Sequence, residues 1–167
     1  MSPAEVAPRA RRASGPRVLS TRSVRWLLNL YPPFLFQGVR VREITPDFLS
    51  ARLEVKRSLL TRNLNGTTFG GAIFAAADPI HSMLYWQLFA RRGERVRVWL
   101  AGARIEYRRP ARSRLTLDVK LDAEDVELAL EELRDKGRTR RTHGLEAVDE
   151  AGELCARIEV DVWAGRR

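Results

Sequence analysis

Apolar side chains recur at every second position in six segments of the chain, which is the period of a β-strand with one buried face. These segments lie at about 39–44, 48–55, 96–107, 115–121, 139–148 and 154–163. Within the third segment the alternation breaks at Ala101-Gly102, which indicates a β-bulge. The pattern therefore predicts six strands, one of them long and bulged.

Helical spacing marks three other segments. The first, Ser23 to Leu30, places Trp26, Leu27 and Leu30 on one face, and we expect Pro32 and Pro33 to end it. The longest runs from Gly70 to about Arg92, and its first half is rich in glycine and alanine, which lets a sheet approach closely. The third covers about residues 123–136, with Asp122 as its cap and Gly137 as its stop; its buried face comprises Val126, Leu130 and Leu133.

This order of elements predicts an α+β fold, in which an antiparallel sheet of about six strands packs on one dominant helix. Residues 1–21 are rich in Ala, Pro, Ser and Arg and lack apolar periodicity, so we expect a disordered basic tail. Residues 22–167 are then one domain. On this interpretation, deleting residues 1–20 leaves the thermal midpoint nearly unchanged.

Charge and composition exclude several classes of function. Residues 1–25 hold six arginines and one glutamate, and so carry +5 of the net charge of +9, while the rest is spread along the strands. No nucleic-acid-binding motif accompanies the charge, and we expect no nucleic-acid partner. The single Cys155 and the two histidines, His81 and His143, exclude a disulfide framework and a thiolate- or histidine-rich metal site. No apolar run is long enough for a membrane span, and we expect a cytoplasmic protein without metal or cofactor.

One cluster, residues 63–78, carries the strongest indication of chemistry. A Gly70-Gly71 pair opens the long helix, whose free N–H groups can bind an oxyanion. Asp78 follows two turns later among apolar residues, where a carboxylate is costly unless it has a partner or a role. The combination suggests carbonyl polarisation together with a general base or nucleophile. Close packing at the glycines and a kink at Asp78-Pro79 are the structural alternative.

The same residues carry a resemblance to a known family. Asn63, a turn containing Gly66, then Phe69-Gly70-Gly71 and an apolar segment ending in Ala77-Asp78 resemble the signature of hotdog-fold acyl-CoA thioesterases of the phenylacetate-pathway type. They resemble still more closely a related hotdog family described as a domain of unknown function. Phe69 stands where the thioesterase signature has His, as it commonly does in that second family.

The resemblance implies a hotdog fold, an acyl-CoA or related thioester as substrate, and a homodimer or dimer of dimers whose sites are shared between subunits. It implies that Gly71 binds the thioester oxygen, that Asp78 is the general base or nucleophile, and that Asn63 positions the water or thioester. We assign the substrate site to Asn65, Phe69, Gly70, Arg104 and Arg108, the two arginines as contacts for the coenzyme A phosphates.

Other functions remain open at this point. With Phe69 in place of His, the chain could bind or sense acyl-CoA or a lipid without turnover. A hotdog dehydratase normally uses a His–Asp pair, and His81 is the only histidine near Asp78 in the sequence. His81 is more often a core or surface residue in such a position, and we expect His143 to be exposed in its Arg-rich strand.

Overall fold

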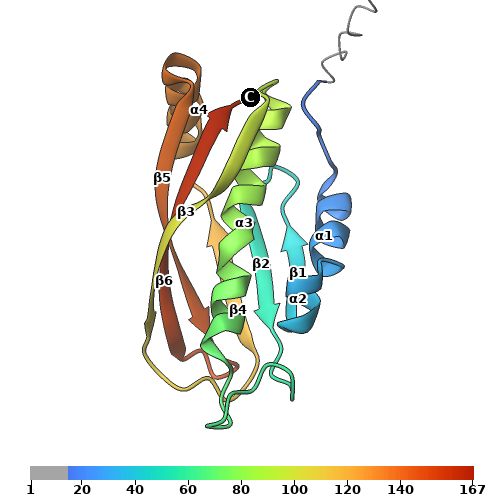
Figure 1. The fold of residues 1–167 in the computed structure, drawn as a ribbon, viewed down its shortest axis with the longest axis vertical. Coiled ribbons are helices and arrows are strands. Elements are labelled where there is room, and N and C mark those ends of the chain that lie inside the picture. Colours follow the sequence, from blue (N-terminus) through green and yellow to red (C-terminus); the bar gives the residue numbers. More distant parts are fainter. Residues whose placement is uncertain (1–14) are drawn as a thin grey trace, which may run out of the picture.

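Six antiparallel strands form one sheet that curves around a single long helix (Figure 1). The computed structural model describes residues 15–167. Along the sheet the order is β1-β2-β4-β5-β6-β3. The strands are β1 (Val39–Ile44), β2 (Ser50–Val55), β3 (Val96–Tyr107), β4 (Leu115–Lys120), β5 (Arg138–Val148) and β6 (Leu154–Arg166). The predicted fold class and the number of strands are confirmed.

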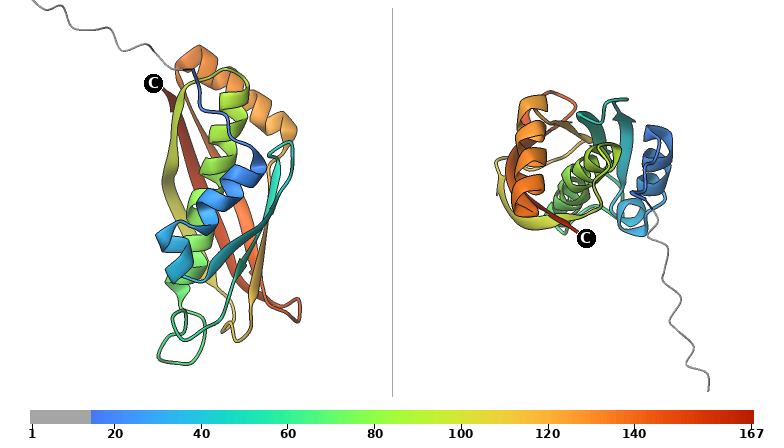
Figure 2. Two further views of the ribbon diagram at one scale, coloured as in Figure 1. Left: turned by 90° about the vertical axis from the view of Figure 1, so that its right-hand side faces the viewer. Right: turned by 90° about the horizontal axis from the view of Figure 1, so that it is seen from above.

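The central helix α3 (Gly70–Arg91) lies along the concave side of the sheet (Figure 2). Ala72, Ala76 and Ala77 are fully buried, so their small side chains bring the helix backbone close to the strands. Alternate strand residues supply the other half of the core: for example, Leu53 pairs with Leu117 across β2 and β4, and both are fully buried. The period of two in the sequence thus becomes a continuous apolar inner face.

The predicted bulge and the third helix are confirmed. The register between β3 and β6 shifts between Leu100 and Gly102. Helix α4 (Ala123–Lys136) begins after Asp122, whose side chain accepts hydrogen bonds from the N–H groups of Glu124 and Asp125. It ends at Gly137, which has a φ of 72°, a left-handed conformation that glycine adopts at little cost.

The start of the domain differs from the prediction. Helix α1 spans Thr21–Asn29, but Trp26 and Leu27 are exposed on it, and Val24 and Leu28 form its buried face. A second short helix, α2 (Pro32–Phe36), follows it. The first helix does end before Pro32 and Pro33, and these prolines also begin α2, because proline at the first two positions of a helix removes only N–H groups that have no helical partner there.

Residues 17–19, just before α1, are hydrogen-bonded to the C-terminal end of α3. The side-chain oxygen of the buried Gln87 accepts a hydrogen bond from the Leu19 N–H at 2.8 Å, and its amide group donates to the Arg17 carbonyl at 3.2 Å. Arg91 donates to the Leu19 carbonyl. Residues 17–19 therefore pack with the folded domain, although the sequence grouped them with the tail; residues 1–14 of that tail lie outside the described residues.

The two edges of the sheet differ in whether another element covers them. Along β1, the side chain of Asn29 pairs with both the N–H and the carbonyl of Val41, at 2.8 and 3.0 Å, so α1 covers that edge. Within residues 15–167 no strand pairs with the outer edge of β3, which is 12 residues long.

None of the helices in this same range is both long and apolar enough to cross a membrane.

Candidate active site

The loop that leads into α3 is held by its own side chains and by the β3–β4 connection. The side-chain oxygen of Asn63 accepts hydrogen bonds from the N–H groups of Asn65 and Thr67, at 3.0 and 3.1 Å, which closes a tight turn. The Thr68 N–H donates to the carbonyl of Ala111 at 2.8 Å, and the Phe69 N–H donates to the carbonyl of Thr61 at 2.7 Å. These bonds fix where the helix begins.

The first N–H groups of α3 are free. No side chain caps the helix at Phe69, and the amides of Gly70 and Gly71 donate no hydrogen bond to any described residue. Unpaired amides at a helix start carry partial positive charge and favour an anion or a polarised carbonyl oxygen. Free amides at the Gly70-Gly71 pair are what the sequence predicted; their role as an oxyanion site remains a prediction.

Both glycines have an aromatic side chain packed closely against them. A Cβ atom on Gly70 would lie 2.6 Å from the Tyr107 hydroxyl oxygen. A Cβ on Gly71 would meet the ring of Phe69, which lies directly against it. The sequence analysis did not identify Tyr107 as a site residue. In the sequence Tyr107 is only an aromatic residue at the end of a strand, and no local pattern indicates that its ring packs against the start of α3.

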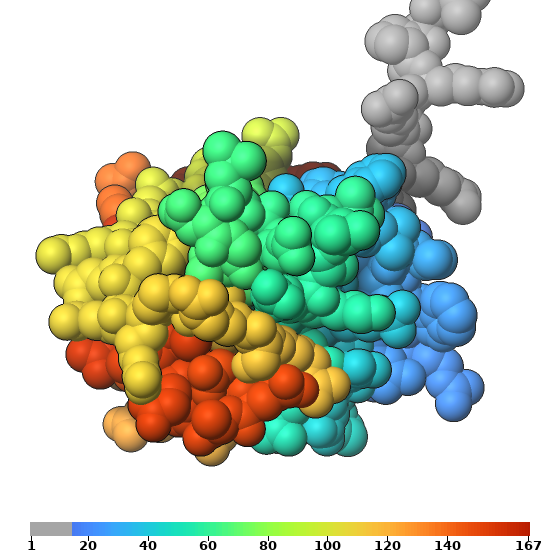
Figure 3. All heavy atoms as spheres, turned by 90° about the horizontal axis from the view of Figure 1, so that it is seen from below, coloured from blue at the N-terminus to red at the C-terminus, as the bar shows by residue number. Residues whose placement is uncertain are grey.

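A cleft of about 370 Å³ opens beside the first of these amides: Gly70 lines it, whereas Phe69, Gly71 and Asp78 do not. Asn63, Gly70 and Tyr107 line it, together with Thr67, Thr68, Ile73 and residues 108–111. Figure 3, which looks onto this end of the molecule, shows the green loop that precedes α3 beside the yellow β3–β4 connection. Asn63 and Gly70 of the predicted site thus share one cleft, whereas Asn65 is exposed in the turn and does not line it.

Asp78 lies on the same face of α3 as Gly71, seven residues further along the helix. Its side chain is exposed in the single chain, although burial by neighbouring atoms still raises the pKa of its carboxyl above the ordinary value. Seven residues correspond to about 10 Å along a helix axis. Asp78 and the Gly71 N–H of one chain are therefore too far apart to act on one carbonyl group.

The face of α3 that carries Gly71 and Asp78 is left uncovered by the chain's own sheet. Phe74, Ala75 and Ser82 on this face are all partly exposed, in contrast to the buried opposite face. On β3, Ala103 pairs with the buried Val160 and so points to the inner side of the sheet, yet it is exposed. The inner surface of this half of the sheet is therefore incomplete in one chain.

The two predicted phosphate contacts are already engaged with an acid. Arg104 lies 3.2 Å from a carboxylate oxygen of Glu106, and Arg108 forms an ion pair with the other oxygen of the same carboxylate. Arg108 lines the cleft and Arg104 does not. Of the pair, only Arg108 is therefore placed beside Asn63 and Gly70.

His81 follows Asp78 by one helical turn, but its ring is buried and stacks on His143 of β5. It is fully buried, and neither ring nitrogen has a hydrogen-bond partner among the described residues. Burial, with a smaller contribution from His143, lowers the pKa of His81 to about 3. His143 is half-buried against it, so the expectation that His143 is exposed was wrong. In residues 15–167 no three His, Cys, Asp or Glu side chains are grouped as metal ligands.

Comparisons with known proteins agree with this architecture. The model of a family described as a domain of unknown function (DUF4442) matches residues 20–164. No curated protein matches the sequence. Among solved structures, a protein of unknown function from Pseudomonas aeruginosa, a probable thioesterase, aligns with a TM-score of 0.80 and 23% identity over 92% of this chain and 100% of that one.

Two further structures are similar at lower identity. A protein of unknown function from Chlorobaculum tepidum has a TM-score of 0.75 and 14% identity, covering 89% of this chain and 98% of its own. A thioesterase from Haemophilus influenzae has a TM-score of 0.67 and 15% identity, covering 91% and 94% of the two chains. At these identities the similarity shows the fold alone, and any chemistry must be argued from the residues of this chain.

Proposed function

Because this chain belongs to the family described as a domain of unknown function (DUF4442) and has the hotdog fold of thioesterase-like proteins, we propose that it hydrolyses an acyl-CoA thioester. The observation that carries the proposal is the pair of free amides at Gly70 and Gly71, beside a cleft lined by Gly70, on the same helix as a carboxylate of raised pKa. The proposal takes these amides as the oxyanion site and this carboxylate as the base of acyl transfer.

We propose that the site is completed by a second copy of the chain. Gly71 and Asp78 of one helix are separated by about 10 Å along its axis, so a carbonyl bound at Gly71 needs the Asp78 of another copy. The open edge of β3 and the exposed inner-facing Ala103 are the surfaces that a second copy would cover. A homodimer, or a dimer of dimers, therefore belongs to the proposed function.

The reaction needs no metal in this scheme. The Asp78 carboxylate takes a proton from water as the water oxygen bonds to the thioester carbon. The electron pair displaced onto the carbonyl oxygen is stabilised by the Gly71 N–H and the positive end of α3. The tetrahedral species then breaks its C–S bond, and the departing thiolate takes the proton back from Asp78. Direct attack by Asp78 on the carbon is the nucleophilic variant.

Asn63 acts on this site through the turn that it closes. Its side chain bonds within the loop, so it positions the amides at Gly70 and Gly71 and leaves one amide hydrogen for water or substrate in the cleft. Asn65, Arg104 and Arg108 remain predicted substrate contacts. A cytoplasmic location is likewise part of the proposal.

Phe69 favours a second candidate function. Its ring lies against Gly71 and is 49% exposed, so an apolar surface rather than an imidazole borders the oxyanion site. Free amides bordered by a phenyl ring, where the thioesterase signature has a histidine, suit binding of acyl-CoA without turnover. The two functions share the same ligand and differ only in the rate of hydrolysis.

Release of free thiol from a panel of acyl-CoAs of increasing chain length tests the proposal. We expect release by the parent protein and little by the Asp78→Asn variant. Binding of acyl-CoA with no thiol release from any member of the panel would establish the binding function instead. Neither binding nor release would reject both.

A further inference from the structure

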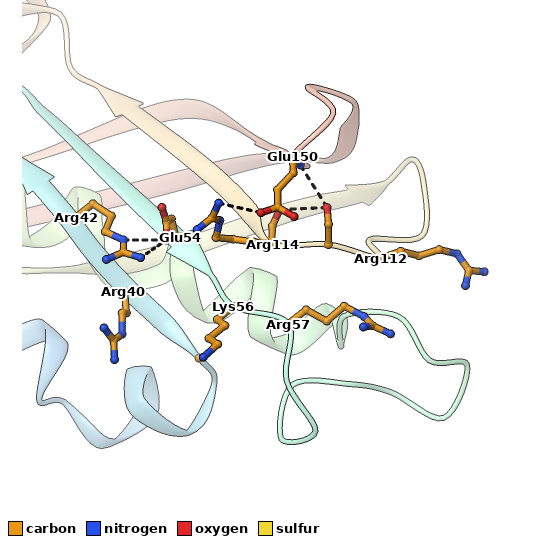
Figure 4. A pocket seen from close by; sticks show the side chains of 10 residues that line it. Arg40, Arg42, Glu54, Lys56, Arg57, Arg112, Arg114 and Glu150 are labelled. Carbon is orange, nitrogen blue, oxygen red and sulfur yellow. Dashed lines mark hydrogen bonds and ion pairs between the residues drawn. The ribbon is translucent and has the colours of Figure 1, made fainter.

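A second hollow, with a volume of about 560 Å³, lies beside the cleft at the same end of the molecule. We call it the basic groove, and it is lined by Gly38, Arg40, Arg42, Glu54, Lys56, Arg57, Arg112, Ser113, Arg114 and Glu150 (Figure 4). Six cationic side chains and two carboxylates give it a net charge of +4. It has the size of a site for a nucleotide-sized molecule.

The ion pairs divide the cations of the basic groove into two sets. Arg42 lies 2.6 Å from Glu54, and Arg114 lies 2.8 Å from Glu150, so both carboxylates are engaged on one wall. Arg40, Lys56 and Arg112 have no acid within ion-pair distance among the described residues. Figure 4 shows Arg40 and Lys56 pointing to the same side, while the side chains of Arg57 and Arg112 extend away from them along the loops.

Arg57 adds a second, independent indication of a ligand. Its terminal nitrogen donates to the Gly66 carbonyl at 2.7 Å, which holds the side chain in place. Its Nε atom is buried and has no hydrogen-bond partner among residues 15–167. The bond to Gly66 thus holds a guanidinium without an acidic partner on the lining of the groove, where its charge favours an anion.

The groove and the cleft share their walls. Residues 108–111 of the β3–β4 connection line the cleft, and residues 112–114 of the same connection line the groove. On the other side Arg57 lines the groove, and through Gly66 it is bonded to the turn whose Thr67 lines the cleft. One elongated ligand can therefore place an anionic end in the groove and its other end at the start of α3.

We propose that the basic groove binds clustered phosphate groups, with Arg40, Lys56, Arg57 and Arg112 as the binding residues. Arginine forks and a lysine suit phosphate oxygens in geometry and charge. The source is either the nucleotide half of coenzyme A, in which case the inference rests on the proposed function, or a free nucleotide. The lining contains no aromatic side chain for stacking bases and two acids lie on its wall, which disfavours a nucleic-acid strand.

The experiment uses two charge reversals and a matched control. Lys56→Glu and Arg112→Glu alter exposed side chains for which no side-chain hydrogen bond or ion pair is present in the described chain, so folding is expected to survive. Arg138→Glu makes the same change at the opposite end of the molecule, at the first residue of β5. Binding of coenzyme A, dephospho-coenzyme A and ADP is measured by calorimetry at low and at physiological salt.

We expect each groove reversal to weaken coenzyme A binding by about tenfold or more, and the control by less than about twofold. ADP binding weakened in parallel, with pantetheine not bound at the groove, identifies the phosphates as the recognised group. A smaller effect on dephospho-coenzyme A than on coenzyme A assigns the 3′-phosphate to the groove. Equal affinities in all three variants, or binding of DNA or an acidic protein but of no nucleotide, would overturn the inference.

Kinetics separate this inference from the proposed function. For acyl-CoA the groove reversals should raise KM with little change in kcat, while hydrolysis of the matching acyl-pantetheine stays at the parent level. Turnover of acyl-CoA that is unaffected by both reversals would reject the groove as the coenzyme A site and keep the thioesterase. Nucleotide binding that depends on Lys56 and Arg112, without any thiol release, would reject the thioesterase and keep the groove.

Discussion

His81 on α3 and His143 on β5 stack with their ring centroids 5.1 Å apart and their planes 7° apart. Both rings are held neutral, because burial lowers the pKa of each. In the unfolded chain a histidine titrates near its ordinary pKa of about 6.5. The pair therefore makes folding sensitive to acid.

Stability should fall as the pH drops below about 6.5. Between that value and the folded-state pKa of His81, about 3, the unfolded chain binds a proton that the folded chain does not, so the free energy of unfolding decreases. The contribution of His81 is up to about 1.4 kcal/mol per pH unit. Urea unfolding at several pH values should show a shallower acid dependence for His81→Phe than for the parent. Parallel curves would show that His81 does not titrate on unfolding.

Asp78→Asn should remove most activity and leave the fold intact. The amide keeps the size of the side chain but cannot accept the proton, and loss of a general base costs about two to four orders of magnitude in rate. In the parent enzyme the rate should fall as the pH drops through the raised pKa of Asp78, at a higher pH than an ordinary aspartate would give. Rates of thiol release across pH check both points; an Asp78→Asn enzyme as fast as the parent would remove Asp78 from the mechanism.

Phe69→His should leave the rate of thiol release unchanged or raise it. The ring lies against Gly71 beside the free amides, and an imidazole there places a hydrogen-bonding group where the phenyl ring offers none. Phe69→Leu serves as the control, since it alters the packing without adding a polar group. A marked loss of activity in the histidine variant, with a normal leucine variant, would mean that the apolar ring itself is required.

Ala103→Glu should break the assembly without unfolding the chain. Ala103 is exposed in the single chain but faces the inner side of β3, where a second copy would bury a charge. Light scattering should give at least twice the chain mass of 19.1 kDa for the parent, and 19.1 kDa for the variant. The variant should also lose thiol release. Ala151→Glu, in the exposed β5–β6 turn, is the matched control.

Deleting residues 1–20 should lower stability, in contrast to the expectation from the sequence. The deletion removes both backbone partners of the buried Gln87, and an unsatisfied buried amide costs about 1–3 kcal/mol. Deletion of residues 1–14 keeps these bonds and is the control. Equal thermal midpoints for the two truncations would show that water replaces Arg17 and Leu19 without cost.

The sequence by itself determined the six strands, the two longer helices and the class of fold. Alternation of apolar and polar residues from Leu115 to Leu121 predicts a strand with one buried face. Asp122 and Gly137 mark the two ends of a helix, because a cap and a left-handed glycine act on the backbone next to them. The free amides at Gly70 and Gly71 could also be predicted from the sequence, because the first N–H groups of any helix have no partner within it.

Only the tertiary structure decided which distant residues meet. Tyr107 against Gly70, His143 on His81, and the groove formed by Lys56 and Arg112 all join segments far apart in the chain. Such contacts depend on strand order and register, which no local pattern encodes. The same holds for ion pairs. Only the fold shows that Arg104 is paired with Glu106 and that Lys56 has no acidic partner among the described residues.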